Sequence, residues 1–351
     1  MKNTYTLFLI FLLVCVFQNA QAQDPRFSQF YASPLNLNPA MTGVYEGQFR
    51  VVANYRELYS SVLGNQPFRT ISASFDYRHQ LNRGSYAGFG VNLMRDAAGI
   101  SNFNRQFGAV SASVMKQLGG GGYRSTDQFL VAGAQIGVGQ QGIDFNRLWF
   151  SNQYDVDNGA VNYDNPTGEG FMRNSSDMYI DFNAGVLWYA LFDERQSIYF
   201  GAAMHHLNSP NISFLDQDDK LPSRWVAHMG GELPFGKELS ILPAIAVMGQ
   251  NQSLSTTLGA NFRYTNREWR ELAMRVGGWA HAVNDLESGF ALDAITVAAI
   301  LELEDWNLGF SYDVTTSTLT AANNGRGAFE VSLIYTHPAK VRRKDVNCPN
   351  F

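Results

Sequence analysis

Charged residues are scarce in this sequence, and so are cysteines. Asp, Glu, Lys and Arg make up 16% of the 351 residues, whereas soluble domains have about 25%. The two cysteines, Cys15 and Cys348, exclude a disulfide scaffold and also a structural zinc cluster, which normally needs about four ligands. The formal net charge of -5 argues against a nucleic-acid partner.

Long apolar runs are also missing. Beyond the N-terminal segment no stretch is long enough for a transmembrane helix, which needs about 20 apolar residues. Aromatic residues nevertheless reach 13%, there are 32 glycines, and the mean hydropathy is only -0.18. For a chain of this length, that profile favours one large barrel over two soluble domains.

Residues 1–22 have the features of a secretory signal. Lys2 precedes an apolar run from Leu7 to Phe17, and Ala20-Gln21-Ala22 matches the small-residue cleavage motif. We expect cleavage after Ala22, with an uncleaved membrane anchor as the alternative. The mature chain would then keep Cys348 as its single cysteine.

Alternation of apolar and polar residues is the dominant pattern. Ile71 and Phe75 are interleaved with Ser72 and Asp76, which places the two kinds on opposite faces of a strand. The pattern returns around 180–188, 254–264 and 306–314. Fourteen strands are expected, beginning near Gln48, Phe68, Ser85, Phe103, Asp127, Tyr179, Gln196, Pro222, Glu238, Ser253, Glu271, Gly289, Glu304 and Gly327.

An even number of alternating strands predicts an all-β, antiparallel outer-membrane barrel in contact with outer-membrane lipid, because closure satisfies every backbone group inside hydrocarbon. Long connections should face outside, namely Ser60 to Pro67, Ala97 to Asn102, Gln141 to Met178 and Asn208 to Leu221. The alternative is a soluble β-sandwich or secreted adhesin. A dry sandwich core could not hold the repeated Asp, Arg and Asn unpaired, so a water-filled interior is favoured.

Few patterns indicate chemistry. His205 and His206 are adjacent, so we expect them on opposite faces of a strand, and we identify no catalytic residue, cofactor site or metal site. The loop Asp155–Gly159 and the acids Asp216, Asp218 and Asp219 could offer oxygen ligands to calcium, but they do not fit an EF-hand, and solvated loop tips are the favoured interpretation. The basic tail could contact an acidic partner or be solvated; it comprises Lys340, Arg342, Arg343 and Lys344.

The segment 23–47 is unlike a linker. It carries aromatic residues that favour burial, while Pro34 and Pro39 are unsuited to a sheet ladder. We expect an ordered non-strand plug or cap, followed by a barrel over 48–337 and a periplasmic tail over 338–351.

This segment resembles the start of the PorP/SprF family of type IX secretion system membrane proteins, which carry D-P-x-F-S-Q-[FY]-Y and N-P-A-x-x-G just after the signal. The matching positions are Asp24, Pro25, Phe27, Ser28, Gln29, Phe30, Tyr31, Asn38, Pro39, Ala40 and Gly43. Similarity continues at His205-His206-Leu207, at Leu221-Pro222-Ser223-Arg224-Trp225, at Ser311 to Thr315 and at Cys348-Pro349-Asn350-Phe351. Ser223 departs from the pattern, since a second basic residue is common there.

The resemblance implies a non-enzymatic outer-membrane component of the type IX secretion and gliding machinery. Its implied partners are the translocon, periplasmic anchoring components, and cargo such as adhesins bearing a C-terminal sorting domain. The motif residues would either pack a plug or touch a partner, and packing is favoured. The alternatives are a solute transporter, since a 14-strand barrel is wide enough for a pore, and a surface hydrolase using His205 or His206.

Overall fold

The computed structural model describes residues 24–119, 126–168, 174–193, 195–214, 218–266, 272–285, 289–338 and 348–351. The predicted signal (residues 1–22), Gln23, Asp216 and the basic residues 340–344 lie outside the described residues. Within them, no helix has the length and apolar character needed to cross a membrane.

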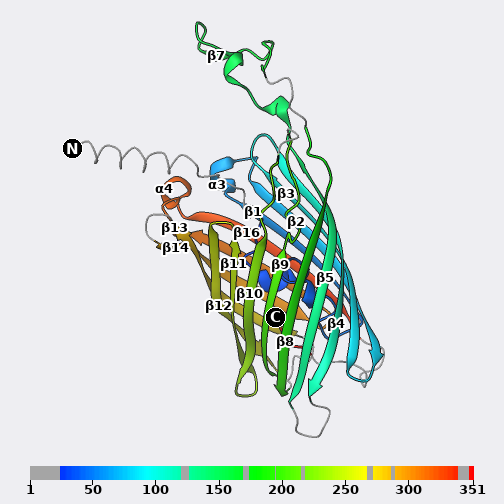
Figure 1. Ribbon diagram of the computed structural model, residues 1–351. Helices are drawn as coiled ribbons and strands as arrows, with labels where there is room; N and C mark the ends of the chain where they lie inside the picture. The colour runs from blue at the N-terminus through cyan, green and yellow to red at the C-terminus, as the bar shows by residue number, and fades with distance from the viewer. Residues whose placement is uncertain are drawn as a thin grey trace, which may run out of the picture.

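Fourteen antiparallel strands close into a barrel in which each strand pairs with its neighbour along the chain, and β1 pairs with β16 (Figure 1). The strands are β1 (Phe49–Leu58), β2 (Phe68–Asn82), β3 (Ser85–Ala98), β4 (Phe103–Gly119), β5 (Asp127–Gly142), β8 (Tyr179–Asp193), β9 (Gln196–His205), β10 (Arg224–Phe235), β11 (Leu239–Gln250), β12 (Ser253–Thr265), β13 (Leu272–Asp285), β14 (Gly289–Leu303), β15 (Trp306–Thr315) and β16 (Arg326–His337). The predicted fold class is therefore confirmed.

Strand positions agree closely with the sequence pattern. Strands begin at Phe68, Ser85 and Phe103, as predicted, and the largest difference is two residues, as at Arg224 where Pro222 was expected. A proline has no N–H for the ladder, which explains why β10 begins after Pro222.

The faces of the strands follow the alternation. Ile71 and Phe75 are 50% and 45% exposed on the outside of the barrel, whereas Ser72 and Asp76 on the same strand are buried in the interior. Every second residue is apolar because it faces lipid, and the intervening ones face the lumen.

The two ends of the barrel differ in their connections. One end, here the loop end, carries the connections 59–67, 99–102, 143–178, 206–223 and 316–325 together with two short ones. The opposite end, the turn end, carries tight turns such as 83–84 and 304–305, and both ends of the barrel chain. In outer-membrane barrels the loop end faces the cell exterior.

The longest connection forms a finger beyond the loop end (Figure 1). It contains the one-turn helices η3 (Phe145–Arg147) and η4 (Ser151–Gln153) and a short hairpin of β6 (Tyr154–Asp155) and β7 (Ala160–Val161). The buried amide of Gln153 organises it, because its Nε2 donates to the Asn165 carbonyl and its Oε1 accepts from the Phe150 N–H. Short helices α3 (Ser60–Leu63) and α4 (Thr320–Asn323) lie in two other connections at this end.

The lumen differs from the water-filled interior that the polar pattern predicted. Much of it is filled by a hydrophobic cluster built from the N-terminal segment and inward-facing wall residues. Its wall side chains include Met115, Phe129, Leu187, Tyr189, Tyr199, Val226, Trp279 and Ile300. Strand alternation identifies the inward-facing residues but gives no information on what lies between opposite walls. This core could therefore be recognised only from the position of the N-terminal segment in the structure.

Candidate functional site

Residues 24–47 lie inside the barrel and form three single-turn helices, η1 (Phe30–Ala32), α2 (Pro34–Leu37) and η2 (Pro39–Met41). Pro34 and Pro39 begin the second and third, where a missing N–H costs nothing. The side chain of Asn38 caps η2 by accepting from the Ala40 N–H. Short helices satisfy backbone groups locally, so a non-strand segment can be buried.

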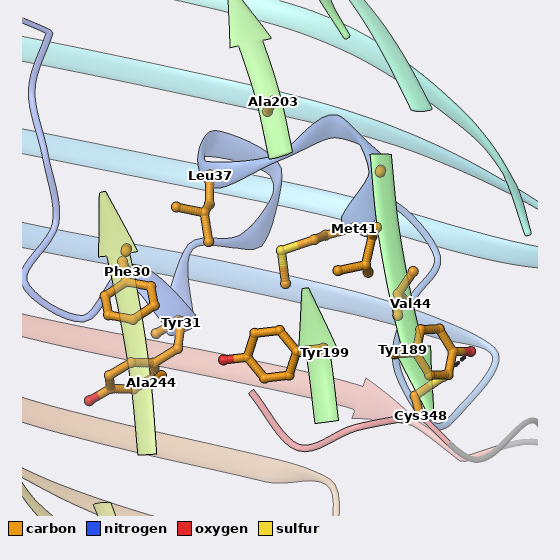
Figure 2. Close-up of a cluster of buried hydrophobic side chains, with 14 of the residues drawn as sticks. Phe30, Tyr31, Leu37, Met41, Val44, Tyr189, Tyr199, Ala203, Ala244 and Cys348 are labelled. Atoms are coloured by element: carbon orange, nitrogen blue, oxygen red, sulfur yellow. Dashed lines mark hydrogen bonds between the residues drawn. The ribbon is translucent and has the colours of Figure 1, made fainter. Parts of the chain in front are cut away.

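Aromatic and aliphatic side chains of this segment pack against the wall. Phe30 and Tyr31 contact Trp279 of β13, with ring centroids 5.4 and 5.3 Å apart. Figure 2 shows Leu37, Met41 and Val44 gathered in the same cluster, near Tyr189 and Tyr199. Phe27, three residues before η1, is also buried.

The motif residues Asn38 and Ala40 pack against positions of the wall strands that are occupied by glycine. Asn38 Nδ2 donates to the Val186 carbonyl at 3.0 Å, and the amide lies 3.1 Å from His228 Nε2. A Cβ on Gly185 would lie 2.0 Å from Asn38 Oδ1, and one on Gly133 would lie 2.5 Å from the Pro39 carbonyl oxygen. Glycines in the wall thus let the Asn-Pro-Ala backbone approach closely.

Asp24 marks the end of the segment nearest the loop end. Its carboxylate pairs with Arg105 of β4 and lies 3.2 Å from Arg224 Nη1 of β10 and 2.6 Å from His206 Nε2. The other ring nitrogen of His206, Nδ1, lies 2.9 Å from Asp181 Oδ2 of β8. Three residues, Arg105 of β4, Arg224 of β10 and His206 between β9 and β10, therefore converge on Asp24, and Asp181 of β8 holds the histidine.

The electrostatics of this cluster favour charged groups. Burial acts to raise the pKa of Asp24, but Arg105 and Arg224 outweigh it and hold that pKa well below its ordinary value. Burial likewise acts to lower the pKa of His206, but hydrogen bonds to Asp181 and Asp24 leave it raised. A protonated His206 donates from both ring nitrogens to the two carboxylates.

A second charged cluster holds Ser28 and Gln29. Glu330 of β16 accepts from the Ser28 N–H at 2.8 Å and from the Gln29 N–H at 3.0 Å. Arg56 of β1 bridges Glu330 at 3.0 Å and Asp313 of β15 at 2.8 Å, and also donates to the Ser28 hydroxyl. The cluster joins the first strand to the last two strands beneath the motif.

A third contact fixes the turn that follows η2. Gly43 has φ +77°, and its N–H donates to Asp76 Oδ2 of β2 at 2.8 Å. Arg50 of β1 pairs with the same carboxylate at 2.8 Å. A Cβ at position 43 would lie 2.9 Å from the Gly88 Cα, so both the backbone conformation and the space require glycine.

The adjacent histidines do not lie on opposite faces, so that prediction was wrong. Both are buried, with ring centroids 6.3 Å apart. His205 is the last residue of β9, and His206 has φ 57°, which ends the strand and turns the second ring into the lumen. A left-handed non-glycine residue is rare, and sequence alternation alone gives no sign of it.

The last four residues lie inside the barrel toward the turn end. The Cys348 thiol is free and buried, and it accepts from Arg78 Nη1 at 3.4 Å. Burial raises the pKa of this thiol, although Arg78 acts in the opposite direction. Arg275 donates to the Phe351 carbonyl at 2.8 Å, and the ring centroids of Phe351 and Tyr199 are 4.8 Å apart.

A cavity of about 420 Å³ remains in the lumen beside Asp24. Its lining comes from the N-terminal segment and from the loop-end residues of strands on either side of the β1–β16 seam: Asp24, Pro25, Arg26, Ser28, Arg56, Leu58, Tyr59, Phe68, Thr70, Asp96, Ala98, Phe103, His281, Asp293, Ala294, Asp313, Thr315 and Gly327.

Residues 19–335 match the sequence profile of the family described as type IX secretion system membrane protein PorP/SprF. The chain belongs to this family. The family resemblance of the N-terminal motif is therefore confirmed, and the chain is an outer-membrane component of type IX secretion. PorP/SprF is a family of secretion components and not a family of enzymes.

Solved outer-membrane barrels are similar to this chain at very low identity. The TodX monoaromatic hydrocarbon channel deltaS2 mutant has a TM-score of 0.48 and 10% identity, covering 87% of this chain and 93% of its own. A Pseudomonas aeruginosa FadL homologue has a TM-score of 0.48 and 12% identity, covering 85% and 92%. CdiB from Acinetobacter baumannii has a TM-score of 0.46 and 6% identity, covering 82% and 60%. No curated protein matches the sequence.

In this PorP/SprF chain, the motif residues lie along one buried path in the N-terminal segment, and their contacts are on different strands of the wall. Sequence reasoning missed the wall residues that receive them. These are Arg56, Asp76, Arg105, Asp181, Arg224, Asp313 and Glu330. The sequence does show that charged residues recur at the inward-facing positions of the strands. That pattern indicates which residues face the lumen but not which residues they contact.

The acidic loops hold no metal-like cluster in the part of the chain that the structure describes. In the loop Asp155–Gly159, Asp155 Oδ1 accepts from the Asp157 and Asn158 N–H groups, which closes a local turn. Asp218 pairs instead with Lys220 at 3.3 Å.

Proposed function

We propose that this protein is a plugged barrel that supports secretion, or retention at the cell surface, of cargo bearing a C-terminal sorting domain. Adhesins, including those of gliding motility, are the expected cargo. It would act with the type IX translocon and with periplasmic anchoring components. Family membership supports a role in type IX secretion, and the filled lumen supports docking of a protein as the way the barrel acts.

The observation that carries the mode of action is the seating of the N-terminal segment. Charged clusters hold it near Asp24 and near Ser28, and Asp76 holds it at Gly43. Moving it would leave Arg105 and Arg224 without the Asp24 carboxylate, at a cost of about 3–5 kcal/mol for each broken buried pair, and would break the backbone hydrogen bonds to Glu330 and Asp76. A segment held this way supports docking of a protein at the loop end over passage of solute through the lumen.

We further propose that the protein performs no bond chemistry. The histidine best placed for catalysis, His206, has both ring nitrogens engaged by Asp24 and Asp181, and among the described residues no hydroxyl or thiol is hydrogen-bonded to its ring. Its neighbour His205 contacts the Leu37 carbonyl at 3.2 Å. These arrangements suit packing of the segment, since a general base needs a reachable proton on a substrate or nucleophile.

The second candidate function is solute transport. The cavity of about 420 Å³ beside Asp24 favours it, because a solute entering from outside would meet this space first. Transport would then require the N-terminal segment to leave its seat.

Deletion of the gene, with proteomics of the medium and the cell surface, separates the two functions. Proteins with C-terminal sorting domains should be lost from the surface or accumulate in the periplasm, and a plasmid copy of the gene should restore them. Unchanged surface proteins together with reduced uptake of a small solute would reject the secretion role in favour of transport.

We propose that processing removes residues 1–22, leaving the segment 23–47, the barrel 48–337 and a C-terminal tail from 338. The burial of the Asp24 side chain in the lumen supports a mature start close to it. N-terminal sequencing of the purified protein should begin at Gln23, and a sequence beginning at Met1 would show an uncleaved anchor.

A further inference from the structure

The cavity beside Asp24 has an aromatic wall, which is unusual for the inside of a membrane barrel. Tyr59, Phe68 and Phe103 line it where β1 ends and where β2 and β4 begin. The rings of Tyr59 and Phe68 lie 6.2 Å apart with an edge-to-face geometry. These rings lie at the loop end and outside the hydrophobic cluster formed by the described residues; the Phe103 ring also lies 6.3 Å from the ring of Phe214, centroid to centroid.

The backbone at Tyr59 is strained in a way that serves this wall. Tyr59 has φ 59° and ψ 30°, the left-handed region that a bulky residue rarely adopts. It stands directly before α3, and its N–H is held by the Gly327 carbonyl at 3.0 Å. Strain of this kind concentrates at binding sites.

Four carboxylates line the cavity, and three of them have cationic partners. Asp24 pairs with Arg105, Asp293 with Arg26 at 2.8 Å, and Asp313 with Arg56 at 2.8 Å. Asp96 of β3 differs, because among the described residues it makes no ion pair and accepts one hydrogen bond, from the Thr70 hydroxyl at 2.5 Å.

Asp96 is half-buried in the loop-end half of β3, and the alternation of that strand points it into the lumen. Its ladder neighbours are Thr70 and Arg105, and the Arg105 guanidinium is directed to Asp24 and to the Tyr179 hydroxyl. A carboxylate withdrawn from water without a cation is costly, and an incoming cation would recover that cost.

We propose that this cavity is a binding site for a basic side chain, arginine or lysine, of a partner polypeptide that arrives from the loop end. Asp96 receives the positive charge, and Tyr59, Phe68 and Phe103 cover the apolar stem through cation–π and apolar contact. A cavity of about 420 Å³ is of the size that holds a side chain or a small ligand and is far too small for a folded domain. The identity of the partner as cargo rests on the proposed function.

An acidic or purely apolar side chain fits less well. Arginines offset three of the four carboxylates, and Arg26 and Arg56 themselves line the cavity, so the charge that remains is that of Asp96. An acid would be repelled by Asp96, and an apolar group would leave it desolvated without compensation. The preference for a cation is therefore a property of the charge distribution and not of the cavity's size.

The test uses the purified full-length protein in detergent micelles and two probes, benzamidine and its uncharged analogue benzamide, measured by calorimetry. Benzamidine should bind, and Asp96→Asn should weaken it at least tenfold. Benzamide should bind weakly and to the same extent in both proteins. Asparagine at 96 can still accept from Thr70, so the variant is expected to fold, and heat-modified gel mobility checks that the barrel is intact.

Two further arms complete the test. Asp164→Asn, an exposed carboxylate in the long finger, is the matched control and should leave benzamidine binding unchanged. The peptide acetyl-Leu-Arg-Leu-amide should compete with benzamidine, whereas the same peptide with citrulline should not. Absence of benzamidine binding, equal binding by Asp96→Asn, or failure of the arginine peptide to compete would each overturn the proposal. Because these measurements need no secretion, they fail independently of the gene-deletion result.

Discussion

Asp24 is the residue on which the loop-end half of the N-terminal segment depends. Its carboxylate is buried among Arg105, Arg224 and His206, and each of these comes from a different part of the wall. A buried ion pair adds little net stability compared with an apolar replacement, yet removing one partner leaves the others unpaired at high cost. The arrangement therefore specifies where the segment sits.

Asp24→Asn is expected to destabilise the protein by about 3–5 kcal/mol, because Arg105 and Arg224 lose their carboxylate while remaining buried. Urea unfolding in lipid vesicles, followed by tryptophan fluorescence, measures the change. Asp164→Asn removes an exposed carboxylate and should stay within about 0.5 kcal/mol of the native protein. Equal stability of the two variants would show that the cluster does not hold the segment.

Seating of the segment should also depend on pH. Because the pKa of His206 is raised, its contribution is complete below its ordinary value of 6.5 and is lost as pH rises through the raised pKa. Because the pKa of Asp24 is lowered, its contribution is complete above the ordinary 3.8 and is lost as pH falls through the lowered pKa. Seating is therefore strongest between these two ordinary values.

Thermal unfolding at a series of pH values checks this dependence. The native protein should lose stability on the alkaline side, and His206→Gln should remove that part of the pH dependence. His79→Gln changes an exposed histidine of β2 and should leave the profile as it is. A native profile that is flat across the titration of His206 would contradict the assignment.

At the scale of the elements, the N-terminal segment and the wall are shaped for each other. Pro34 and Pro39 begin its second and third helical turns, Gly43 follows the third, and the wall strands facing them carry glycine where the backbones approach. Gly133 of β5 faces Pro39 and Ala40, and Gly88 of β3 faces the Thr42 carbonyl. Two backbones can pack this closely only where one of them has no Cβ.

Gly133→Ala should unseat the segment while leaving the barrel closed, because the added Cβ would lie 2.5 Å from the Pro39 carbonyl oxygen. Limited proteolysis of the folded protein should then cleave within 24–47, which is protected in the native protein. Gly278→Ala adds a Cβ in open space on β13 and serves as the control. If residues 24–47 stay protected in Gly133→Ala, the wall accommodates the added Cβ and the close approach of the two backbones does not require glycine at this position.

For the whole molecule, the filled lumen supports the proposed docking function over transport. The hydrophobic cluster joins the N-terminal segment to opposite walls, and Cys348 from the far end of the chain joins it as well (Figure 2). A 14-strand barrel without such filling is wide enough for an aqueous pore.

The intact protein in planar bilayers should therefore show no steady conductance of the kind that open porins give. A variant lacking residues 24–44 should conduct, because it removes the segment and leaves β1 complete. A steady open current from the intact protein would favour the transporter function. A deletion variant that does not conduct would show that the wall side chains and the C-terminal residues 348–351 fill the lumen without the segment.

The positions of the strands could be predicted from the sequence because each strand is specified locally. Alternation of residues such as Ile71 with Ser72 follows from lipid on one side and lumen on the other, and this rule holds without knowledge of neighbours. The burial of the N-terminal motif was expected for the same kind of reason, since Phe30, Tyr31 and two prolines favour an ordered, covered, non-strand segment.

The candidate site could not be predicted in the same way. Alternation marks Arg105, Asp181 and Arg224 as inward-facing, but it gives no information on which residues meet across a lumen. His206 also departs from the alternation, since one left-handed backbone position turns its ring to Asp24.

The sequence by itself determined the class of fold, the boundaries of the strands, their lipid-facing sides and the family. Only the tertiary structure decided that the lumen is filled, that Asp24 is the meeting point of Arg105, Arg224 and His206, and that Asp96 has no cationic partner among the described residues. The physical reason is that strand formation and exposure to lipid depend on residues close together in the chain. Pairing of charges across the lumen depends on barrel closure, which brings together residues more than 80 positions apart, such as Asp24 and Arg105.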